Sequence, residues 1–296
     1  METNPLVTVN ILSFNRKDEL RNTLTKVYGQ DYKNIEVIVV DNASSDGSAE
    51  MVINGFPGVI LIKLEKNIGI AGWNEGFKVA QGEYVLVLDD DSYPNEKVIY
   101  EGVKEIRRNI FIGVIAFRIW NERMTLFENS EFSNKVLPHF VGCGALIRKK
   151  MFEKVGYFYD TLFLYEHERE FTLRLYNAGF IIKYLDNPLI IHNSSYLNRT
   201  DKRKKFYFTR NFLIILFIHF EFRKVIFRMI RISIGRLFSG LKQGGFLSIV
   251  KGISSFILLL PNLIKNRKIL QDEIQKKFNY GNFAGGFHFR QNDWYN

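Results

Sequence analysis

Strand-like and helix-like segments alternate over about the first hundred residues, and this order constrains the fold more than any other feature of the sequence. Four runs rich in β-branched residues have the length of buried strands: residues 7–14, 35–40, 59–64 and 84–88. Between them lie segments in which apolar residues recur at helical spacing: 18–29, 48–53 and 74–80. Such alternation predicts an α/β fold with a mostly parallel central sheet and helices on both faces.

The pattern loosens after residue 100 but still indicates further elements. Strands are expected at residues 113–119 and 180–185, and helices at 149–155 and 168–178. The chain has 296 residues, of which 46% are hydrophobic, so it can bury the core of one large α/β domain, or of a domain plus an extension. Cys143 is the only cysteine, which excludes a disulfide scaffold and favours a reducing compartment.

Basic charge is concentrated in one stretch of the chain. There are 41 Lys and Arg against 31 Asp and Glu, a net charge of +10. Eleven basic residues and only two acidic ones fall between positions 199 and 236, close to apolar segments at 206–220 and 246–264. We therefore expect a catalytic α/β domain over residues 1–198, followed by a basic, amphipathic helical region over 199–296. The first six residues lack a basic stretch and a long apolar one, so no secretory signal is expected.

Three polar clusters follow predicted strands, at residues 13–16, 41–47 and 89–91. Open α/β sheets bind ligands at the carboxyl ends of their strands, so these clusters are the first candidates for a site. An acidic residue after the second strand is also typical of dinucleotide-binding folds, which need a glycine-rich turn after the first strand. The turn at 13–16 reads Ser-Phe-Asn-Arg and has no glycine, which excludes a nicotinamide cofactor.

Asp89, Asp90 and Asp91 form an acidic triplet directly after an apolar strand. Adjacent carboxylates repel one another unless a cation or several donors offset their charge. Alternate residues of an extended segment point the same way, so Asp89 and Asp91 can share a ligand while Asp90 faces elsewhere. Oxygen ligands suit Mg²⁺ or Mn²⁺, which in turn bind a diphosphate. The alternative is a solvated acidic turn, and the buried strand before the triplet favours a functional site.

Two other features offer polar groups near the same edge of the sheet. Asp41 ends the second strand and can accept hydrogen bonds from a ribose hydroxyl or a base N–H; an Asx-turn or helix cap is the alternative. Residues 67–76 place small side chains around Asn67 and Asn74. Small residues allow a ligand to approach the backbone closely, and the amides offer directional bonds. A simple loop-to-helix junction would explain the glycines but not both asparagines.

A second acidic cluster opens the helix expected at residue 168. Glu168 can deprotonate an acceptor hydroxyl there. Acidic residues are also common in the first turn of a helix without any catalytic role, and the helix dipole is expected to lower the pKa of Glu168. Glu170 and Arg174 lie four residues apart and are expected to pair. His192 follows a strand and can bind a metal through one ring nitrogen, with a satisfied core or surface histidine as the alternative.

Six segments resemble the family 2 glycosyltransferases and occur in that family's order, over roughly residues 5–195. They read VTVNILSFNR, VIVVDNASSDGS, NIGIAGWNEGF, GEYVLVLDDDS, GCGALIRKKMFEKVGYF and FLYEHEREFTLRLYNAGF. The resemblance implies a GT-A nucleotide-sugar-binding fold and an inverting, rhamnosyltransferase-like enzyme.

The resemblance also implies roles for particular residues. Asp41 would contact the nucleobase, and Asp89 would lie near the ribose or the sugar. The nucleotide and donor would be bound by Ser13, Asn15, Arg16, Asp41, Asn67, Asn74, Asp89, Asp90 and Gly144. Asp91 and His192 would bind the divalent cation, Mg²⁺ or Mn²⁺.

One position departs from the family, which usually has Glu-Asp where this chain has His167-Glu168. Glu168 keeps a carboxylate at the position of the catalytic base. The implied reaction is a direct displacement that inverts the anomeric carbon of a UDP- or dTDP-linked hexose or deoxyhexose. The acceptor would be a hydroxyl of a surface polysaccharide or glycolipid. Because His167 replaces an acid, a non-catalytic nucleotide-sugar-binding protein is the alternative.

The C-terminal region indicates where the protein acts. Basic and apolar residues at helical spacing suit a helix that lies in an anionic membrane interface. Lys251 and Pro261 make residues 246–264 a poor membrane-spanning helix. We expect a cytoplasmic protein, peripheral at the inner face of the cell membrane, that uses a glycan or lipid-linked glycan acceptor. Packing on the domain, or a homodimer through this region, is the alternative. Nucleic acid is not expected, because the acidic triplet has no use there.

Overall fold

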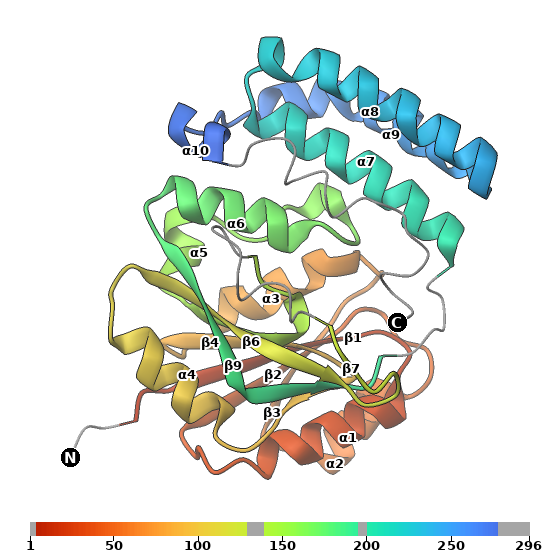
Figure 1. Cartoon of the computed structure of the whole chain (residues 1–296). Coiled ribbons are helices and arrows are strands. Elements are labelled where there is room, and N and C mark those ends of the chain that lie inside the picture. The colour runs from red at the N-terminus through yellow and green to blue at the C-terminus, as the bar shows by residue number, and fades with distance from the viewer. Residues whose placement is uncertain (1–3, 129–138, 195–199, 278–296) are drawn as a thin grey trace.

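A computed structural model of the chain describes residues 4–128, 139–194 and 200–277. Its central feature is one sheet with helices on both faces (Figure 1). The described strands run in the order β3-β2-β1-β4-β8-β6-β9-β5, with β7 beside β6. The predicted α/β fold is therefore confirmed.

The sheet is parallel in its first half and mixed in its second. The first half contains β1 (Val7–Ser13), β2 (Ile35–Asp41), β3 (Val59–Lys63) and β4 (Tyr84–Asp89), all paired in parallel. The second half contains β5 (Ser92–Pro94), β6 (Ile112–Asn121), β7 (Leu126–Phe127), β8 (Ala145–Arg148) and β9 (Ile181–His192). Strand β8 runs antiparallel to both of its neighbours, β4 and β6, whereas β6 and β9 are parallel.

The expectation of a mostly parallel sheet thus holds for the first four strands and is corrected for the rest. Antiparallel neighbours need no helical crossover. Along the described part of the connection, the chain goes from β6 to β8 through β7 and the 3₁₀ turn η3 (Gly142–Gly144).

Helices cover both faces of the sheet and enclose one apolar core on each. One core takes side chains from α1 (Lys17–Tyr28), α2 (Ser48–Gly55) and α4 (Val98–Arg107). The other takes them from α3 (Gly72–Val79), α5 (Lys150–Val155) and α6 (His167–Asn177). Strand β2 supplies both cores, because successive residues of a strand point to opposite faces. Val37 and Val39 belong to the first core, and Ile38 and Val40 to the second.

Helix α3 lies unusually close to β1, and Gly76 makes this approach possible. A Cβ atom at Gly76 would lie 2.1 Å from Oδ1 of Asn10, so no other residue fits without a shift. The Asn10 amide also donates a hydrogen bond to the carbonyl oxygen of Trp73 at 2.9 Å. This contact fixes the segment that contains Asn67 and Asn74 against the carboxyl ends of the first strands.

The C-terminal region is helical, as expected, and its described part contains four helices: α7 (Asp201–His219), α8 (Phe222–Gln243), α9 (Phe246–Lys265) and α10 (Asp272–Lys277). Helix α7 lies over α6, and α8 and α9 lie on the far side of α7 (Figure 1). The predicted domain boundary at 198/199 falls outside the described residues.

The apolar run of α7 is buried, which corrects one expectation. Side chains from Phe212 to Ile218 are at most 6% exposed and belong to the same core as Phe171 of α6. This run therefore packs on the α/β domain and is not available to a membrane. Three of the basic residues, Lys205, Arg210 and Arg236, are buried as well. The Lys205 ammonium, for example, donates to the carbonyl of Gly244 at 2.8 Å.

Candidate active site

The carboxyl ends of three adjacent strands bring together residues that are far apart in the sequence. Ser13 of β1 lies opposite Asp41 of β2, and Leu12 lies opposite Asp89 of β4. The hydroxyl of Ser13 is buried and makes no hydrogen bond within the described part of the chain. This edge is where the sequence predicts the nucleotide.

The loops after β1 and β2 hold each other in place. The Asp41 carboxylate accepts a hydrogen bond from the backbone of Ser44 at 3.1 Å, so the Asx-turn considered as the alternative is present. Asn15 adopts a left-handed backbone with φ 54°, and its Oδ1 accepts from the backbone of Ser45 at 2.7 Å. The backbone N–H of Asn15 donates a hydrogen bond to the hydroxyl oxygen of Ser44 at 2.9 Å. Asp41 and Asn15 therefore shape the loop through contacts within the protein.

Arg16 joins the β1 loop to the acidic triplet. Its guanidinium forms an ion pair with Asp91 and lies 3.5 Å from Oδ1 of Asp90. The other carboxylate oxygen of Asp90 accepts from the backbone of Phe14 at 3.1 Å. Burial, together with the neighbouring Asp91, raises the pKa of Asp90 well above its ordinary value. Asp90 thus anchors the loop, while Arg16 balances the charge of Asp91.

His192 connects Asp91 to Glu128, a carboxylate that no pattern in the sequence singles out. Its Nδ1 lies 2.9 Å from both oxygens of Glu128. Its Nε2 lies 3.2 Å from Oδ1 of Asp91, and both side chains are almost completely buried. Burial alone would lower the pKa of His192, but its contacts with Cys143, Asp91 and Glu128 raise it well above its ordinary value, so without a cation the ring carries a proton on both nitrogens. In the neutral ring, with Nδ1 donating to Glu128, the lone pair of Nε2 points at a carboxylate oxygen. That arrangement is repulsive unless a proton or a cation lies between the two atoms.

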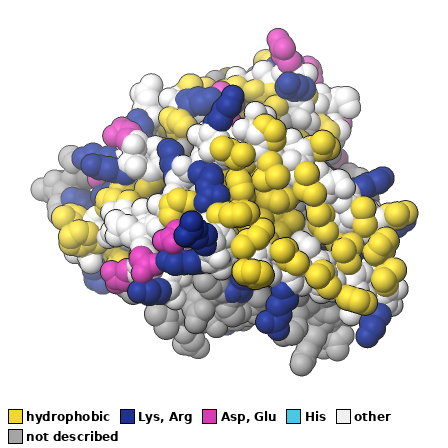
Figure 2. Space-filling view, turned by 90° about the horizontal axis from the view of Figure 1, so that it is seen from above, with side chains coloured by type: hydrophobic (Ala, Val, Ile, Leu, Met, Phe, Trp, Pro, Cys, Tyr) yellow, Lys and Arg dark blue, Asp and Glu magenta, His cyan; other side chains and the backbone are white. Residues whose placement is uncertain are grey.

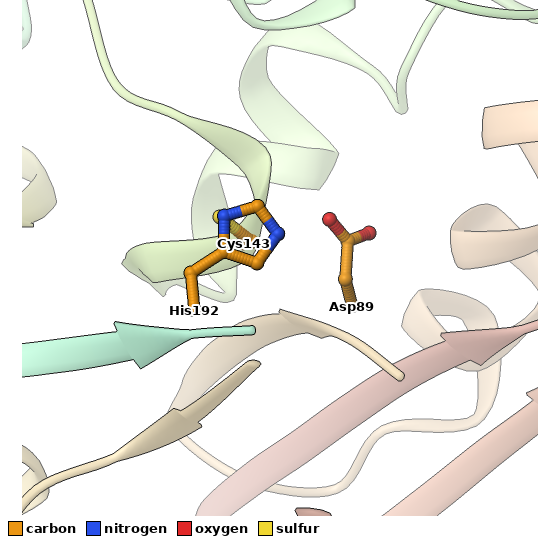
Figure 3. A group of neighbouring side chains, drawn as sticks. All are labelled: Asp89, Cys143 and His192. Atoms are coloured by element: carbon orange, nitrogen blue, oxygen red, sulfur yellow. The ribbon is translucent and has the colours of Figure 1, made fainter. Parts of the chain in front are cut away.

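The donor set around His192 fits a divalent cation. The ligand atoms of Asp89, Cys143 and His192 lie within 4.8 Å of one another, and the three side chains converge from β4, η3 and β9 (Figure 3). Burial raises the pKa of the Cys143 thiol to about 12, so it stays protonated at neutral pH. The carboxylates remain, together with the imidazole of His192, which binds a cation in its neutral form and is backed by Glu128; this set suits Mn²⁺ or Mg²⁺. Asp91 also lines a pocket of about 330 Å³.

Glu168 lies in the first turn of α6 and faces the η3 turn. Its Oε1 accepts a hydrogen bond from the backbone of Gly142 at 3.0 Å, and its side chain is 19% exposed. Burial raises the pKa of Glu168, so the expectation that the helix dipole would lower it is wrong. A carboxylate with a raised pKa and partial access to solvent has the properties of a general base.

His167 lies in an aromatic cage, which explains why this position tolerates the departure from the family. Its ring centroid is 5.4 Å from that of Trp73 and 5.0 Å from that of Phe158. Burial lowers the pKa of His167 to about 3, so the ring is neutral at physiological pH. Its Nδ1 lies 3.2 Å from Oε2 of Glu168. His167 therefore supports the position of Glu168 through packing and adds no charge.

The third acid of this cluster has a structural role. Glu170 pairs with Arg174 at 2.6 Å, as its spacing predicts. It also lies 2.8 Å from Nε2 of His219 in α7, and all of these side chains are largely buried. The Arg174 and His219 contacts lower the pKa of Glu170 to about 2. Glu170 therefore stays ionised and links α6 to α7.

Three other predicted residues make contacts within the protein. Asn74 is buried, and its amide donates to Asp160 at 2.7 Å and to the carbonyl of Phe158 at 2.9 Å. Asn67 accepts from the backbone of Gly69 at 2.8 Å and so shapes its own turn. A Cβ at Gly144 would meet Ile119 and Ile190 in the core. Donor binding by Asn67, Asn74 and Gly144 stays a prediction, and Gly142 is the glycine of this turn that contacts Glu168.

Together, the fold and the site define a class of protein. The mixed α/β sheet, with polar residues at the carboxyl ends of its first strands and an acidic triplet after β4, matches the GT-A fold of nucleotide-sugar-binding proteins. The family model of Glycosyl transferase family 2 matches residues 8–156, half of the chain. The chain belongs to this family.

Curated relatives include enzymes of glycan synthesis. Poly-beta-1,6-N-acetyl-D-glucosamine synthase of Staphylococcus aureus (strain MSSA476) is 25% identical over 197 residues, which cover 60% of this chain and 47% of the relative. UDP-Glc:alpha-D-GlcNAc-diphosphoundecaprenol beta-1,3-glucosyltransferase WfaP of Escherichia coli is 36% identical over 91 residues, 30% of this chain and 36% of the relative. The chain thus spans less than half the length of these relatives.

Solved structures share the fold over most of the chain. Mannosyltransferase PcManGT from Pyrobaculum calidifontis, in complex with GDP-Man and Mn²⁺, superimposes with a TM-score of 0.60 at 16% identity. The match covers 99% of this chain and 84% of that one. TarS 1–349 of S. aureus superimposes with a TM-score of 0.59 at 17% identity, over 96% and 93% of the two chains.

Proposed function

We propose that the protein is an inverting, metal-dependent glycosyltransferase that uses a nucleotide-diphosphate sugar, with UDP- or dTDP-sugars as the first candidates. One observation carries this proposal. The three-residue turn η3 contacts Glu168 through the backbone of Gly142, and its next residue, Cys143, lies in the cluster with Asp89 and His192. The candidate base therefore contacts one residue of this turn, and the candidate cation site includes the next.

The chain supplies the base for a direct displacement. The Glu168 carboxylate accepts the proton of an acceptor hydroxyl as that oxygen forms its bond to the anomeric carbon. The bond from the anomeric carbon to the diphosphate oxygen breaks at the same time, which inverts the configuration. The buried thiol of Cys143 and the neutral His167 add no competing nucleophile or charge at neutral pH.

Asp91 and His192 would hold the cation, with Asp89 beside them. A bound Mn²⁺ or Mg²⁺ neutralises charge on the leaving nucleoside diphosphate. Glu128 fixes the tautomer of His192 by accepting at Nδ1, which leaves Nε2 as the ligand atom. Arg16 contacts Asp91 directly and is well placed to bind a phosphate once a cation takes over its ion pair.

A surface glycan with a lipid-linked acceptor is the substrate class we favour. The name of the E. coli relative specifies an acceptor on diphosphoundecaprenol, which is a lipid carrier. In this chain, α8 and α9 present a continuous apolar surface, here called the α8–α9 face (Figure 2). Its most exposed side chains are Phe227, Phe238, Leu241, Leu247, Leu258 and Ile264, each at least 60% exposed. An apolar surface of this kind on one face marks an interaction site.

The basic side chains near the α8–α9 face favour an anionic membrane as its partner. Exposed basic residues on the same two helices include Arg223, Arg231, Lys242 and Lys251, and Lys and Arg side chains border the apolar area in Figure 2. Among the described helices, α9 is long and apolar enough to cross a bilayer by length and composition. We propose instead that α8 and α9 lie together in the interface, because the basic residues of α8 favour the headgroups. The protein would then be peripheral at the cytoplasmic face.

Substrate binding separates this proposal from a non-catalytic nucleotide-sugar-binding protein. Nucleoside diphosphates and their sugars would be screened by thermal shift with and without Mn²⁺, because ligands of the folded state raise its apparent stability. The best donor would then be followed for release of free nucleoside diphosphate. Mn²⁺-dependent stabilisation together with release supports the enzyme. Stabilisation without release supports the binding protein, and no stabilisation by any nucleotide contradicts both.

A further inference from the structure

The segment that leads into the candidate base has an unusual backbone. Phe163, Tyr165 and Glu166 all have positive φ, at 56°, 66° and 69°. Residues with a Cβ rarely adopt this region, so three of them within four positions need support from their surroundings. Helix α6 begins at the next residue, and Glu168 lies in its first turn. Whatever supports residues 161–166 therefore determines where Glu168 is placed.

Two adjacent polar residues of α7 supply that support. The side-chain nitrogen of Asn211 lies 2.9, 2.7 and 3.0 Å from the carbonyl oxygens of Leu162, Leu164 and Tyr165. The guanidinium of Arg210 donates to the carbonyls of Thr161 at 3.0 Å and Leu162 at 2.7 Å. These are buried donors in the middle of a helix, where polar side chains are retained only when they are hydrogen-bonded.

Arg210 also orients Asn211. Its Nε donates to Oδ1 of Asn211 at 3.0 Å, which turns the amide nitrogen toward the loop. Asn211 is 0% exposed and Arg210 is 9% exposed, so water does not compete for these bonds. The pair thus forms one unit that holds four backbone carbonyls of residues 161–165 at the entrance to α6.

The opposite side of the loop contacts the predicted donor segment. The carbonyl of Phe163 accepts from the backbone of Ile70 at 2.8 Å. A Cβ at Gly69 would lie 2.0 Å from that same oxygen, so the two segments are in direct contact. The loop is therefore clamped between α7 and the segment that carries Asn67. Neither Arg210 nor Asn211 lies in the part of the chain that the family model matches.

We infer that Arg210 and Asn211 are positioning residues for the transfer reaction, which set the location of Glu168 by fixing the backbone of residues 161–166. This inference rests on the proposed role of Glu168 as the base. It assigns to α7 a part in the active site in addition to its packing role. A displacement of a catalytic group by about 1 Å can cost about 10²-fold in rate.

Asn211→Leu tests the inference, because it keeps the volume and removes the donor. We expect turnover to fall about 10²-fold, with calorimetric affinity for the donor nucleotide and Mn²⁺ unchanged. Thr209→Val is the matched control: Thr209 is a buried neighbour in α7, and we expect near-normal turnover. In a Glu168→Gln background, Asn211→Leu should lower turnover no further, because it acts through Glu168.

An equal fold-loss from Asn211→Leu in both backgrounds would overturn the inference, as would normal turnover in a folded Asn211→Leu protein. If that variant does not fold, Arg210→Lys tests the same unit, since it keeps the charge and removes the forked donor. Normal turnover in Arg210→Lys would then overturn the inference. If the proposed function itself is wrong, Glu168→Gln alone retains full turnover, and this result distinguishes that failure from failure of the inference.

Discussion

At the scale of single residues, the clearest arrangement is the row of Glu128, His192 and Asp91. Each member is of a type that is common on protein surfaces, yet here the imidazole is buried between two carboxylates. Partners of this kind fix the tautomer of a metal-binding histidine and typically change metal affinity 10–100-fold when mutated. Glu128 can therefore be tested without relying on activity.

We expect Glu128→Gln to weaken Mn²⁺ binding about 10–100-fold, measured by electron paramagnetic resonance of free Mn²⁺. Asp91→Asn removes a direct ligand, so it should abolish metal-dependent nucleotide binding in the same titration while the fold persists. Glu122→Gln is the control: the Glu122 carboxylate accepts from the hydroxyl of Tyr93 at 3.1 Å, and its contact with His192 is a backbone N–H to carbonyl bond that the substitution keeps. Equal Mn²⁺ affinity in Glu128→Gln and wild type would remove Glu128 from the site.

The pKa of Glu168 gives a second residue-scale prediction. A general base must be deprotonated, so turnover falls as the pH drops through its pKa. Burial raises that pKa above the value of about 4.3 for a free glutamate, so the acid limb should lie at higher pH than an exposed glutamate would give. The pH profile of turnover measures this limb. Residual activity of Glu168→Gln should lack it, and an unchanged limb in that variant would assign it to another group.

At the scale of elements, the C-terminal helices divide into two groups. Helix α7 completes the core of the α/β domain, while α8 and α9 expose apolar side chains on their far side. Deleting the whole region would remove α7 and expose the apolar side chains of α6 that it covers, so deletion cannot test membrane binding. Substitutions at the most exposed positions can, because they leave the core intact.

Phe227 and Leu258 are 80% and 81% exposed on α8 and α9. We expect the pair Phe227→Glu and Leu258→Glu to abolish flotation with anionic liposomes at low salt. Wild-type binding should weaken as salt rises, because each basic residue contributes about 1 kcal/mol that salt screens. Ile110→Glu is the control, since Ile110 is 72% exposed outside these helices. If the wild type does not float but sediments as a dimer that the double variant breaks, the α8–α9 face is a subunit interface.

At the scale of the whole molecule, the sequence predicts the structure best where its hydrophobic periodicity is strict. Strands β1, β2 and β4 and the carboxylates that follow them could be predicted, because buried strands and strand-end acids leave a short-range pattern. The order of the strands in the sheet could not be predicted, since β8 pairs with β4 although about 60 residues separate them in the sequence. Glu128 left no local signal, and Gly142 stood out only as part of a segment that resembles the family; their contacts arise when β9 and α6 fold beside them.

The C-terminal region shows the same limit. Its helices follow from composition and spacing, but the burial of Phe212–Ile218 depends on α6, which no helical pattern in the run itself reveals. Nothing in the sequence distinguishes Arg210 and Asn211 from other residues of the C-terminal region. In the structure they are part of the path from α7 to Glu168.

The turnover of Glu168→Gln tests the central claim most directly. With the identified donor, Mn²⁺ and an acceptor, we predict a loss of about 10²–10⁴-fold in the rate of nucleoside diphosphate release. Donor affinity by calorimetry should barely change, since Glu168 contacts the η3 turn and not the strand ends. Near-normal turnover in Glu168→Gln, with the loss appearing instead in Glu166→Gln or Glu170→Gln, would contradict the account and place the base elsewhere in the acidic cluster.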